Sequence, residues 1–155
     1  MAQEDKELLI KDLCARLDTN LVCSIYRTDD EGVGYRDEIL HGYCKGDIWY
    51  EFYFREDCSI GIDNVSKIKP YLFPLSSMTE EQLYKLKEIT DFKYNHNTLE
   101  LLEWTETHTT LEFWLEEVPQ YSVIEVFDWL DKNHFDYRCL IERGLAIDAT
   151  GLNIY

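Results

Sequence analysis

The chain has 155 residues, of which 31 are acidic and 15 are basic, so its formal net charge is −16 at pH 7. Such a charge repels nucleic-acid phosphates and anionic lipid head groups, and we expect no direct binding to nucleic acid or to a membrane. The composition, with 45% hydrophobic and 14% aromatic residues, excludes a disordered chain. We therefore expect one acidic domain spanning residues 1–155.

Localisation follows from the apolar runs and the cysteines. No apolar run approaches the ~18 residues of a membrane-spanning helix, and the first residues lack a basic and apolar secretory signal. The five cysteines are odd in number and never spaced as C-x-x-C. We expect reduced thiols, a cytoplasmic location and no cofactor or bound metal.

The first third of the chain predicts a helix followed by strands. Apolar residues at helical spacing predict a helix over residues 4–17, and alternation then predicts a strand over 21–26. A polar loop at 28–34, which contains two glycines, leads to a second predicted strand at 35–44. The Lys45-Gly46 pair fits a tight hairpin turn, because glycine tolerates a positive φ.

Alternation is clearest just after that turn. Ile48, Tyr50, Phe52 and Phe54 occupy every second position and predict one face of a third strand. A further short strand is predicted over residues 58–62, so this part of the chain favours an antiparallel meander.

The middle of the chain carries two prolines in the run KPYLFPL at 69–75. They predict an extended connector and argue against both a helix and a central strand. Thr79 with Gln82 three residues later predicts a capping box for a helix over 80–90. Alternation over 92–118 favours strands, although the same residue types also suit a helix.

Near the C-terminus, Ser122 and Glu125 predict a second capping box, which opens a helix over 123–134. Asp136 is the predicted cap of a short helix that Gly144 terminates. Together these elements predict the α+β class: a single domain in which helices cover an antiparallel sheet.

Two segments resemble a group of known sequences. IKPYLFPLSSMTEE at 68–81 and DWLDKNHFDYRCLIERGLA at 128–146 resemble segments of small uncharacterised proteins found in gut anaerobes and their phages or prophages. In those proteins an arginine often stands at the position of Phe73 and a glycine at that of Cys139. The resemblance implies an origin in a mobile element, and it assigns an activity to no residue.

An uncompensated acidic stretch is the main candidate for function. Residues 94–131 contain no Lys or Arg, which favours a surface that docks a basic protein, with exposed aromatic rings providing affinity. One alternative is a solvated acidic face that only aids solubility. The other is that both faces of the sheet are covered, by a helix and by the 70–75 connector, so that the aromatic rings are buried. The candidate partner-binding residues are Trp49, Tyr53, Glu100, Glu103, Glu106, Glu112, Trp114, Glu116 and Glu117.

Two further interpretations belong to other classes. An enzyme would need His134, Asp136, Arg138 and a cysteine to converge in a pocket. A lone histidine at a helix end is more often a cap or a packed residue than a metal ligand. A nucleic-acid mimic would need its carboxylates in ordered rows at the spacing of duplex phosphates. The sequence names no catalytic or metal-binding residue and no oligomeric state. It favours an accessory or regulatory protein that binds a basic partner.

Overall fold

The computed structural model describes residues 1–29, 32–45, 50–55, 58–89 and 120–155. Its elements confirm the predicted α+β class. The helices are α1 (Gln3–Ala15), α2 (Glu80–Ile89) and α4 (Gln120–Lys132), with 3₁₀ turns at Ile62–Lys67 and Leu75–Ser77. The strands are β1 (Val22–Asp29), β2 (Gly32–Ile39), β3 (Gly42–Lys45), β4 (Tyr50–Arg55), β5 (Cys58–Gly61), β6 (Ile68–Pro74), β7 (Phe135–Asp136) and β8 (Ile147–Asp148).

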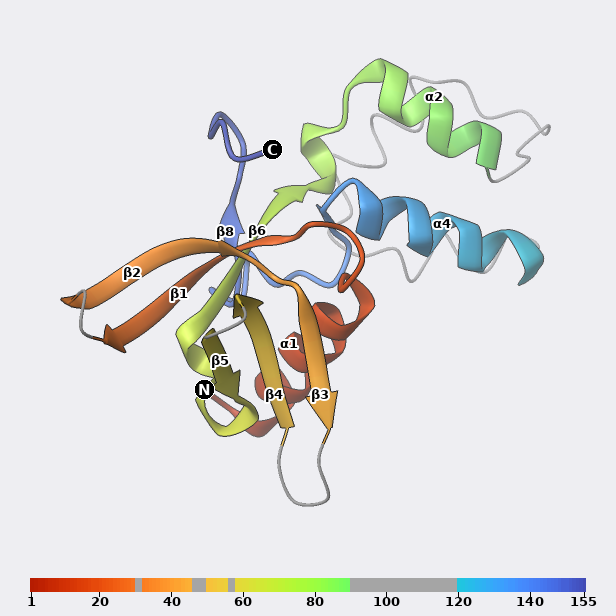
Figure 1. The fold of residues 1–155 in the computed structure, drawn as a ribbon. Coiled ribbons are helices and arrows are strands. Elements are labelled where there is room, and N and C mark those ends of the chain that lie inside the picture. The colour runs from red at the N-terminus through yellow and green to blue at the C-terminus, as the bar shows by residue number, and fades with distance from the viewer. Residues whose placement is uncertain (30–31, 46–49, 56–57, 90–119) are drawn as a thin grey trace.

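The described strands form two sheets. One has the order β2-β1-β6-β7, with β8 also paired to β6, and the other has the order β3-β4-β5. The predicted antiparallel pairing holds for β1 with β2 and for β3, β4 and β5. The C-terminal strands β7 and β8 instead run parallel to β6, so the first sheet is mixed. Figure 1 shows the β1–β2 hairpin projecting from the body of the molecule.

Two hydrophobic clusters hold these elements together. In the first, Leu9 and Leu13 of α1 pack beneath both sheets, on side chains such as Ile25, Phe52 and Leu72. In the second, α2 and α4 pack against each other and against Phe135 of β7. In Figure 1 this helix pair and the β1–β2 hairpin lie on opposite sides of the molecule.

The predicted connector at 69–75 is wrong, because these residues form β6, which pairs with three other strands. The register explains why a proline is tolerated there. Leu40 N–H donates to the Leu21 carbonyl at 2.8 Å, so in β1 the odd-numbered residues bond towards β2. Pro70 stands opposite Cys23, and its missing N–H therefore removes no bond to β1.

The predicted strand at 35–44 is also corrected. It is two strands, since β2 ends at Ile39 in the first sheet and β3 begins at Gly42 in the second. Leu40 N–H still bonds to β1, whereas the next N–H, of His41, donates to the Tyr53 carbonyl of β4 at 2.8 Å. The polar loop is shorter than predicted, because β1 continues to Asp29 and β2 starts at Gly32.

The capping predictions have different outcomes. Thr79 N–H donates to Gln82 Oε1 at 2.8 Å and Gln82 N–H to Thr79 Oγ1 at 3.2 Å, which is the predicted capping box of α2. Ser122 is not an N-cap, because α4 already begins at Gln120. The predicted helix over 136–144 is absent: Asp136 ends β7 and turns follow. The strands proposed for 92–118 lie outside the described residues.

Candidate functional site

Among the predicted partner-binding residues, Tyr53 lies in the described part of the chain. It is half-buried in β4, and its hydroxyl donates to Glu51 Oε2 at 3.3 Å. The neighbouring Phe52 and Phe54 are fully buried, which confirms the predicted inward face of this strand. The rest of the set lies outside the described residues: Trp49, Glu100, Glu103, Glu106, Glu112, Trp114, Glu116 and Glu117.

His134, the first of the alternative site residues, follows α4 with a positive φ of 58°. Its side chain is buried, and its ring stacks on that of Tyr155 at a centroid distance of 3.9 Å. Burial, together with the positive charge of Arg16, lowers the pKa of His134 to about 4. The imidazole is therefore neutral at pH 7. Its Nδ1 has no hydrogen-bond partner among the described residues.

The Asp136 carboxylate accepts hydrogen bonds from the backbone that follows it. Its Oδ1 accepts the N–H groups of Arg138 at 3.2 Å and Leu140 at 2.9 Å, and its Oδ2 accepts that of Ile141 at 2.8 Å. Three amide donors thus surround a buried carboxylate, as they would at a helix start, although only turns follow. The sequence correctly identified Asp136 as a cap but not the structure that it caps.

Arg138 joins a cluster of charged groups that the sequence did not predict. Its Nη1 donates to Asp12 Oδ1 at 2.6 Å and lies 3.9 Å from Asp131 Oδ1. Its guanidinium group also sits over the ring of Tyr137, 4.3 Å from the centroid. The Tyr137 hydroxyl donates to both carboxylate oxygens of Asp131, at 3.0 and 3.2 Å.

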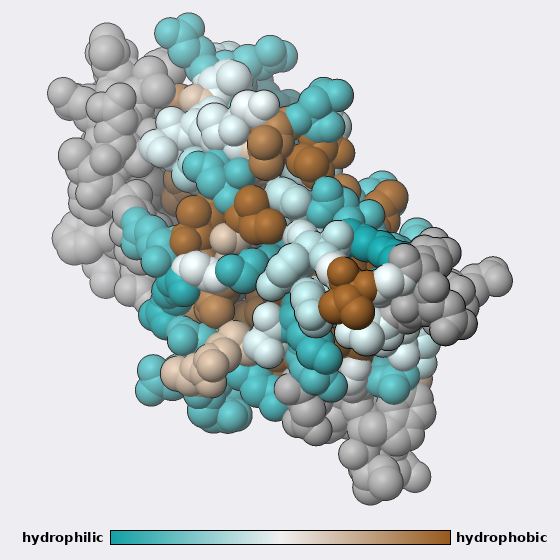
Figure 2. Space-filling view, turned by 90° about the vertical axis from the view of Figure 1, so that its left-hand side faces the viewer, coloured by the Kyte–Doolittle hydropathy of each residue, from teal (hydrophilic) through white to brown (hydrophobic). Residues whose placement is uncertain are grey.

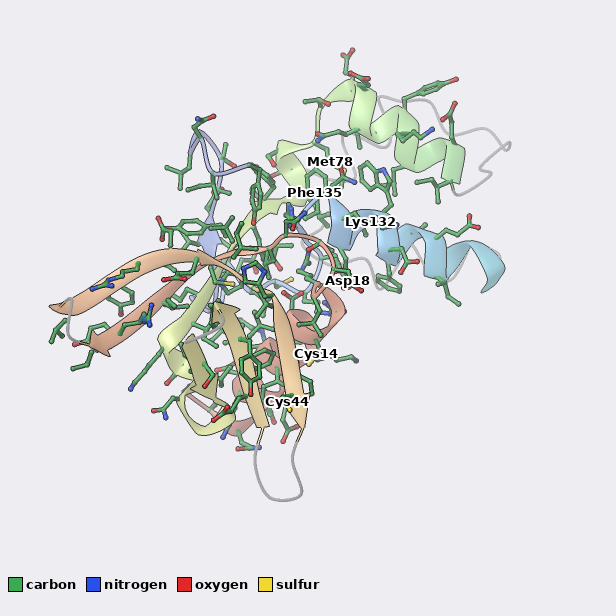
Figure 3. The ribbon with its side chains drawn as sticks, in the orientation of Figure 1. Cys14, Asp18, Cys44, Met78, Lys132 and Phe135 are labelled. Atoms are coloured by element: carbon green, nitrogen blue, oxygen red, sulfur yellow. The ribbon has the colours of Figure 1, made fainter. Side chains whose placement is uncertain are left out.

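Arg16 is the centre of this cluster and is 0% exposed. Its Nε donates to Asp12 Oδ2 at 3.0 Å, and its Nη2 lies 3.3 Å from Asp131 Oδ1. The same guanidinium group donates to backbone carbonyls, at 3.2 Å to Asp131 and at 2.8 Å to Phe135. One side chain at the end of α1 therefore binds the end of α4 and the start of β7. Figure 3 labels Asp18, which follows α1, together with Lys132, the last residue of α4, and Phe135, the first residue of β7.

Two arginines and two aspartates balance the charge of this cluster. Burial acts to lower the pKa of Arg16, but the carboxylates of Asp12 and Asp131 outweigh it and raise that pKa. Burial raises the pKa of Asp131, against the opposing effect of Arg16 and Arg138. Burial likewise raises the pKa of the Tyr137 hydroxyl, which stays protonated and donates. All of these polar groups are engaged with one another, which is the arrangement of a structural ion-pair network.

The sequence held one signal of this network. Asp12 and Arg16 stand four residues apart beside the apolar stripe of α1, a spacing at which a helix brings an acid and a base together. Their partners Asp131 and Arg138 lie more than a hundred residues further on, and no local pattern connects them. Arg138 depends on Asp12 of α1 for its ion pair, whereas His134 stacks on Tyr155.

The β1–β2 hairpin presents a different kind of surface. Side chains at the odd positions of β2 face solvent, with Val33 68%, Tyr35 66% and Ile39 40% exposed. Tyr35 packs edge-to-face against Tyr26 at 5.2 Å, and the Asp37 carboxylate accepts the Tyr71 hydroxyl at 2.9 Å. Figure 2 views the molecule from the side of the hairpin and shows separate hydrophobic patches among hydrophilic residues.

Two of the described thiols, Cys14 and Cys23, are unsuited to nucleophilic chemistry. Burial raises the pKa of Cys14, and it raises that of Cys23 well above its usual value, so both stay as neutral thiols. Within the described ranges no three His, Cys, Asp or Glu side chains gather as a metal site. In the same ranges no helix is long and apolar enough to cross a bilayer.

Comparisons with family models, with curated proteins and with solved structures found no match to this chain. Its function must therefore be inferred from the chemistry of its own residues.

Proposed function

We propose that this chain is a small accessory or regulatory protein that binds a basic protein partner. The observation that carries the proposal is the net charge of −16. Asp12, Asp131, Arg16 and Arg138 cancel within the buried network, so the whole excess of negative charge lies outside it. Such an excess steers a basic protein towards the chain and repels another acidic one.

Affinity in such an interface comes from side chains that lose water on binding, and aromatic residues contribute most of it. The exposed Val33, Tyr35 and Ile39 of β2 provide such a surface. The acidic residues between 94 and 131 are proposed to contribute steering. The resemblance to proteins of gut anaerobes and their phages supports a role in a mobile element.

An enzyme is the less supported alternative. Asp136 is occupied by three backbone N–H groups, and Arg138 is paired with Asp12. His134 is stacked on Tyr155 and neutral. The contacts of all three side chains are those of residues that stabilise the fold.

The proposal is tested by capture of the tagged chain's partner at low and moderate salt, with two charge-reversal variants as baits. One variant changes Glu112, Glu116 and Glu117 to Lys. The matched control makes the same change in charge at Glu4, Glu7 and Glu142, which are exposed and lie outside the acidic stretch 94–131 of the sequence. We expect one stoichiometric basic protein that moderate salt releases, that the control retains and that the first variant loses. An acidic or neutral partner, or capture that salt leaves unchanged, contradicts the proposal.

A further inference from the structure

Strand β2 has one side that pairs with no other described strand. It is the outermost strand in the order β2-β1-β6-β7, and it pairs with β1 over its whole length, from Val22 opposite Ile39 to Asp29 opposite Gly32. Because Leu40 N–H bonds to Leu21, the even-numbered residues of β2 bond to β1. The N–H and C=O groups of Val33, Tyr35, Asp37 and Ile39 therefore point away from the sheet. No other described strand lies on that side of β2 in Figure 1.

Two of the features that usually protect such an edge are missing from β2. Its sequence, GVGYRDEI, contains no proline, and its pairing with β1 shows no register shift, unlike that of β4 with β5. The strand is eight residues long and projects from the body of the molecule. An extended segment could form a regular antiparallel ladder along it.

The side chains beside this edge define which segment fits. In an added strand, alternate residues lie on the same face as Val33, Tyr35 and Asp37. The exposed ring of Tyr35 can receive a Lys or Arg through a cation–π contact, and the exposed Asp37 can pair with a second one. Val33 and Ile39, on either side, suit apolar residues.

Charge also distinguishes a partner from a second copy of this chain. Two copies would each bring a net charge of −16 to the interface and would repel each other. A basic segment is attracted by the same charge. The occupant consistent with both the backbone and the charge is thus an extended basic segment of another protein.

We propose that the β2 edge accepts an extended basic segment of the partner as an added antiparallel strand, with Tyr35 and Asp37 contacting its basic side chains. This inference rests on the proposed function and names the surface and the kind of segment that serve it. Such a segment has small polar residues at every second position. Its other positions are, in order, apolar, basic, basic and apolar. In an antiparallel strand these lie beside Ile39, Asp37, Tyr35 and Val33.

The test uses a synthetic peptide in which Thr alternates with Val, Lys, Arg and Val in that order. Binding to the full chain is measured by calorimetry and by chemical shift changes. The informative variants are Tyr35→Pro and Tyr35→Ala: both remove the ring, but only proline removes the outward N–H, and an edge strand tolerates it. A peptide with its basic and apolar positions scrambled is the matched control for register.

We expect Tyr35→Ala to weaken peptide binding several-fold. Tyr35→Pro should weaken it about tenfold further, because proline also removes one N–H that would bond to the added strand and distorts the ladder. Asp37→Lys should reduce both the affinity and its salt dependence. The inference is overturned if Tyr35→Pro binds as well as Tyr35→Ala, if the shifts map to another surface, or if the chain instead dimerises through β2.

The two proposals fail in different ways. If the captured partner still binds the Tyr35→Pro variant fully, the proposed function stands and the edge is not its site. If neither the peptide nor any basic protein binds the native chain at low salt, the proposed function itself is wrong.

Discussion

The network around Arg16 and the outer edge of β2 contrast in how they use their polar groups. Inside, Arg16 satisfies two carboxylates and several backbone carbonyls while 0% exposed. On the edge, the backbone N–H and C=O groups of Tyr35 and Asp37 point away from β1, and Tyr35 is 66% exposed. Groups that bind one another stabilise a fold, whereas groups left in water remain available to a partner. A charged group in this chain is therefore not by itself evidence of a binding site.

The largest effect is expected in the buried network, for the substitution Arg16→Met. The substitution leaves Asp12 and Asp131 buried beside a single arginine, and we expect the free energy of unfolding to fall by about 3–5 kcal/mol. Arg143→Ala is the control, because it breaks an exposed 2.9 Å pair with Asp5 and should cost less than about 1 kcal/mol. Urea denaturation measures both. Equal losses of unfolding free energy in the two variants would mean that the buried network stabilises the fold no more than an exposed ion pair does.

The next effect in size is expected at Asp136. Asp136→Ala removes the acceptor for three N–H groups and should cost about 1–3 kcal/mol. Asp148→Ala is the matched control, since Asp148 accepts one exposed N–H, that of Thr150, at 2.8 Å. Thermal unfolding should show a larger loss for the first variant. If catalysis rather than structure required Asp136, its removal would leave the melting temperature unchanged.

A pH titration of stability tests the burial of His134. Its pKa falls from 6.5 to about 4 on folding, so between these values unfolding takes up a proton. The contribution of His134 to stability is complete above pH 6.5 and is lost as the pH falls towards 4, with a slope of up to about 1.4 kcal/mol per pH unit. His134→Asn, which tolerates the positive φ, should flatten this slope. An identical pH dependence in both proteins would mean that the imidazole is not buried neutral.

The smallest effect is expected on the outer edge. Tyr35→Ser removes an exposed ring and its contact with Tyr26, so the loss of stability should be no more than about 1 kcal/mol. Phe52→Ser, on a buried face of β4, provides the contrast in the same denaturation series. A large loss at Tyr35 would mean that this ring holds the hairpin in place and is not available to a partner.

Local patterns predicted the elements that depend on local contacts. Helical spacing identified α1, α2 and α4, and alternation identified β1 and β4, because each buries one face with its own period. Pro70 misled the prediction of β6, since its tolerance depends on standing opposite Cys23, which the sequence does not reveal. Asp136 accepts the following N–H groups as a cap does, but Cys139 has a φ of 57°, a left-handed conformation that does not fit the predicted helix over 136–144.

The candidate sites were harder to predict because they depend on distant residues. The outward direction of Tyr35 follows from the register of β2 on β1, whereas the sequence predicts a loop over residues 28–34. Sequence neighbourhood groups Arg138 with His134, yet its partner is Asp12, 126 residues away. Cys139 has a φ of 57°, in the left-handed region that favours glycine, and no local pattern in the sequence reveals it.

The bonds from Arg16 to the carbonyls of Leu130 and Phe135 span 114 and 119 residues of chain. A ribosome adding about 5–20 residues per second would need roughly 6–24 s to reach Phe135 after it has added Arg16. Through that interval α1, with its 13 residues, is too short to be a stable helix alone and keeps Asp12 and Arg16 in water. The buried network around Arg16 can therefore form only after residues 130–135 have been synthesised.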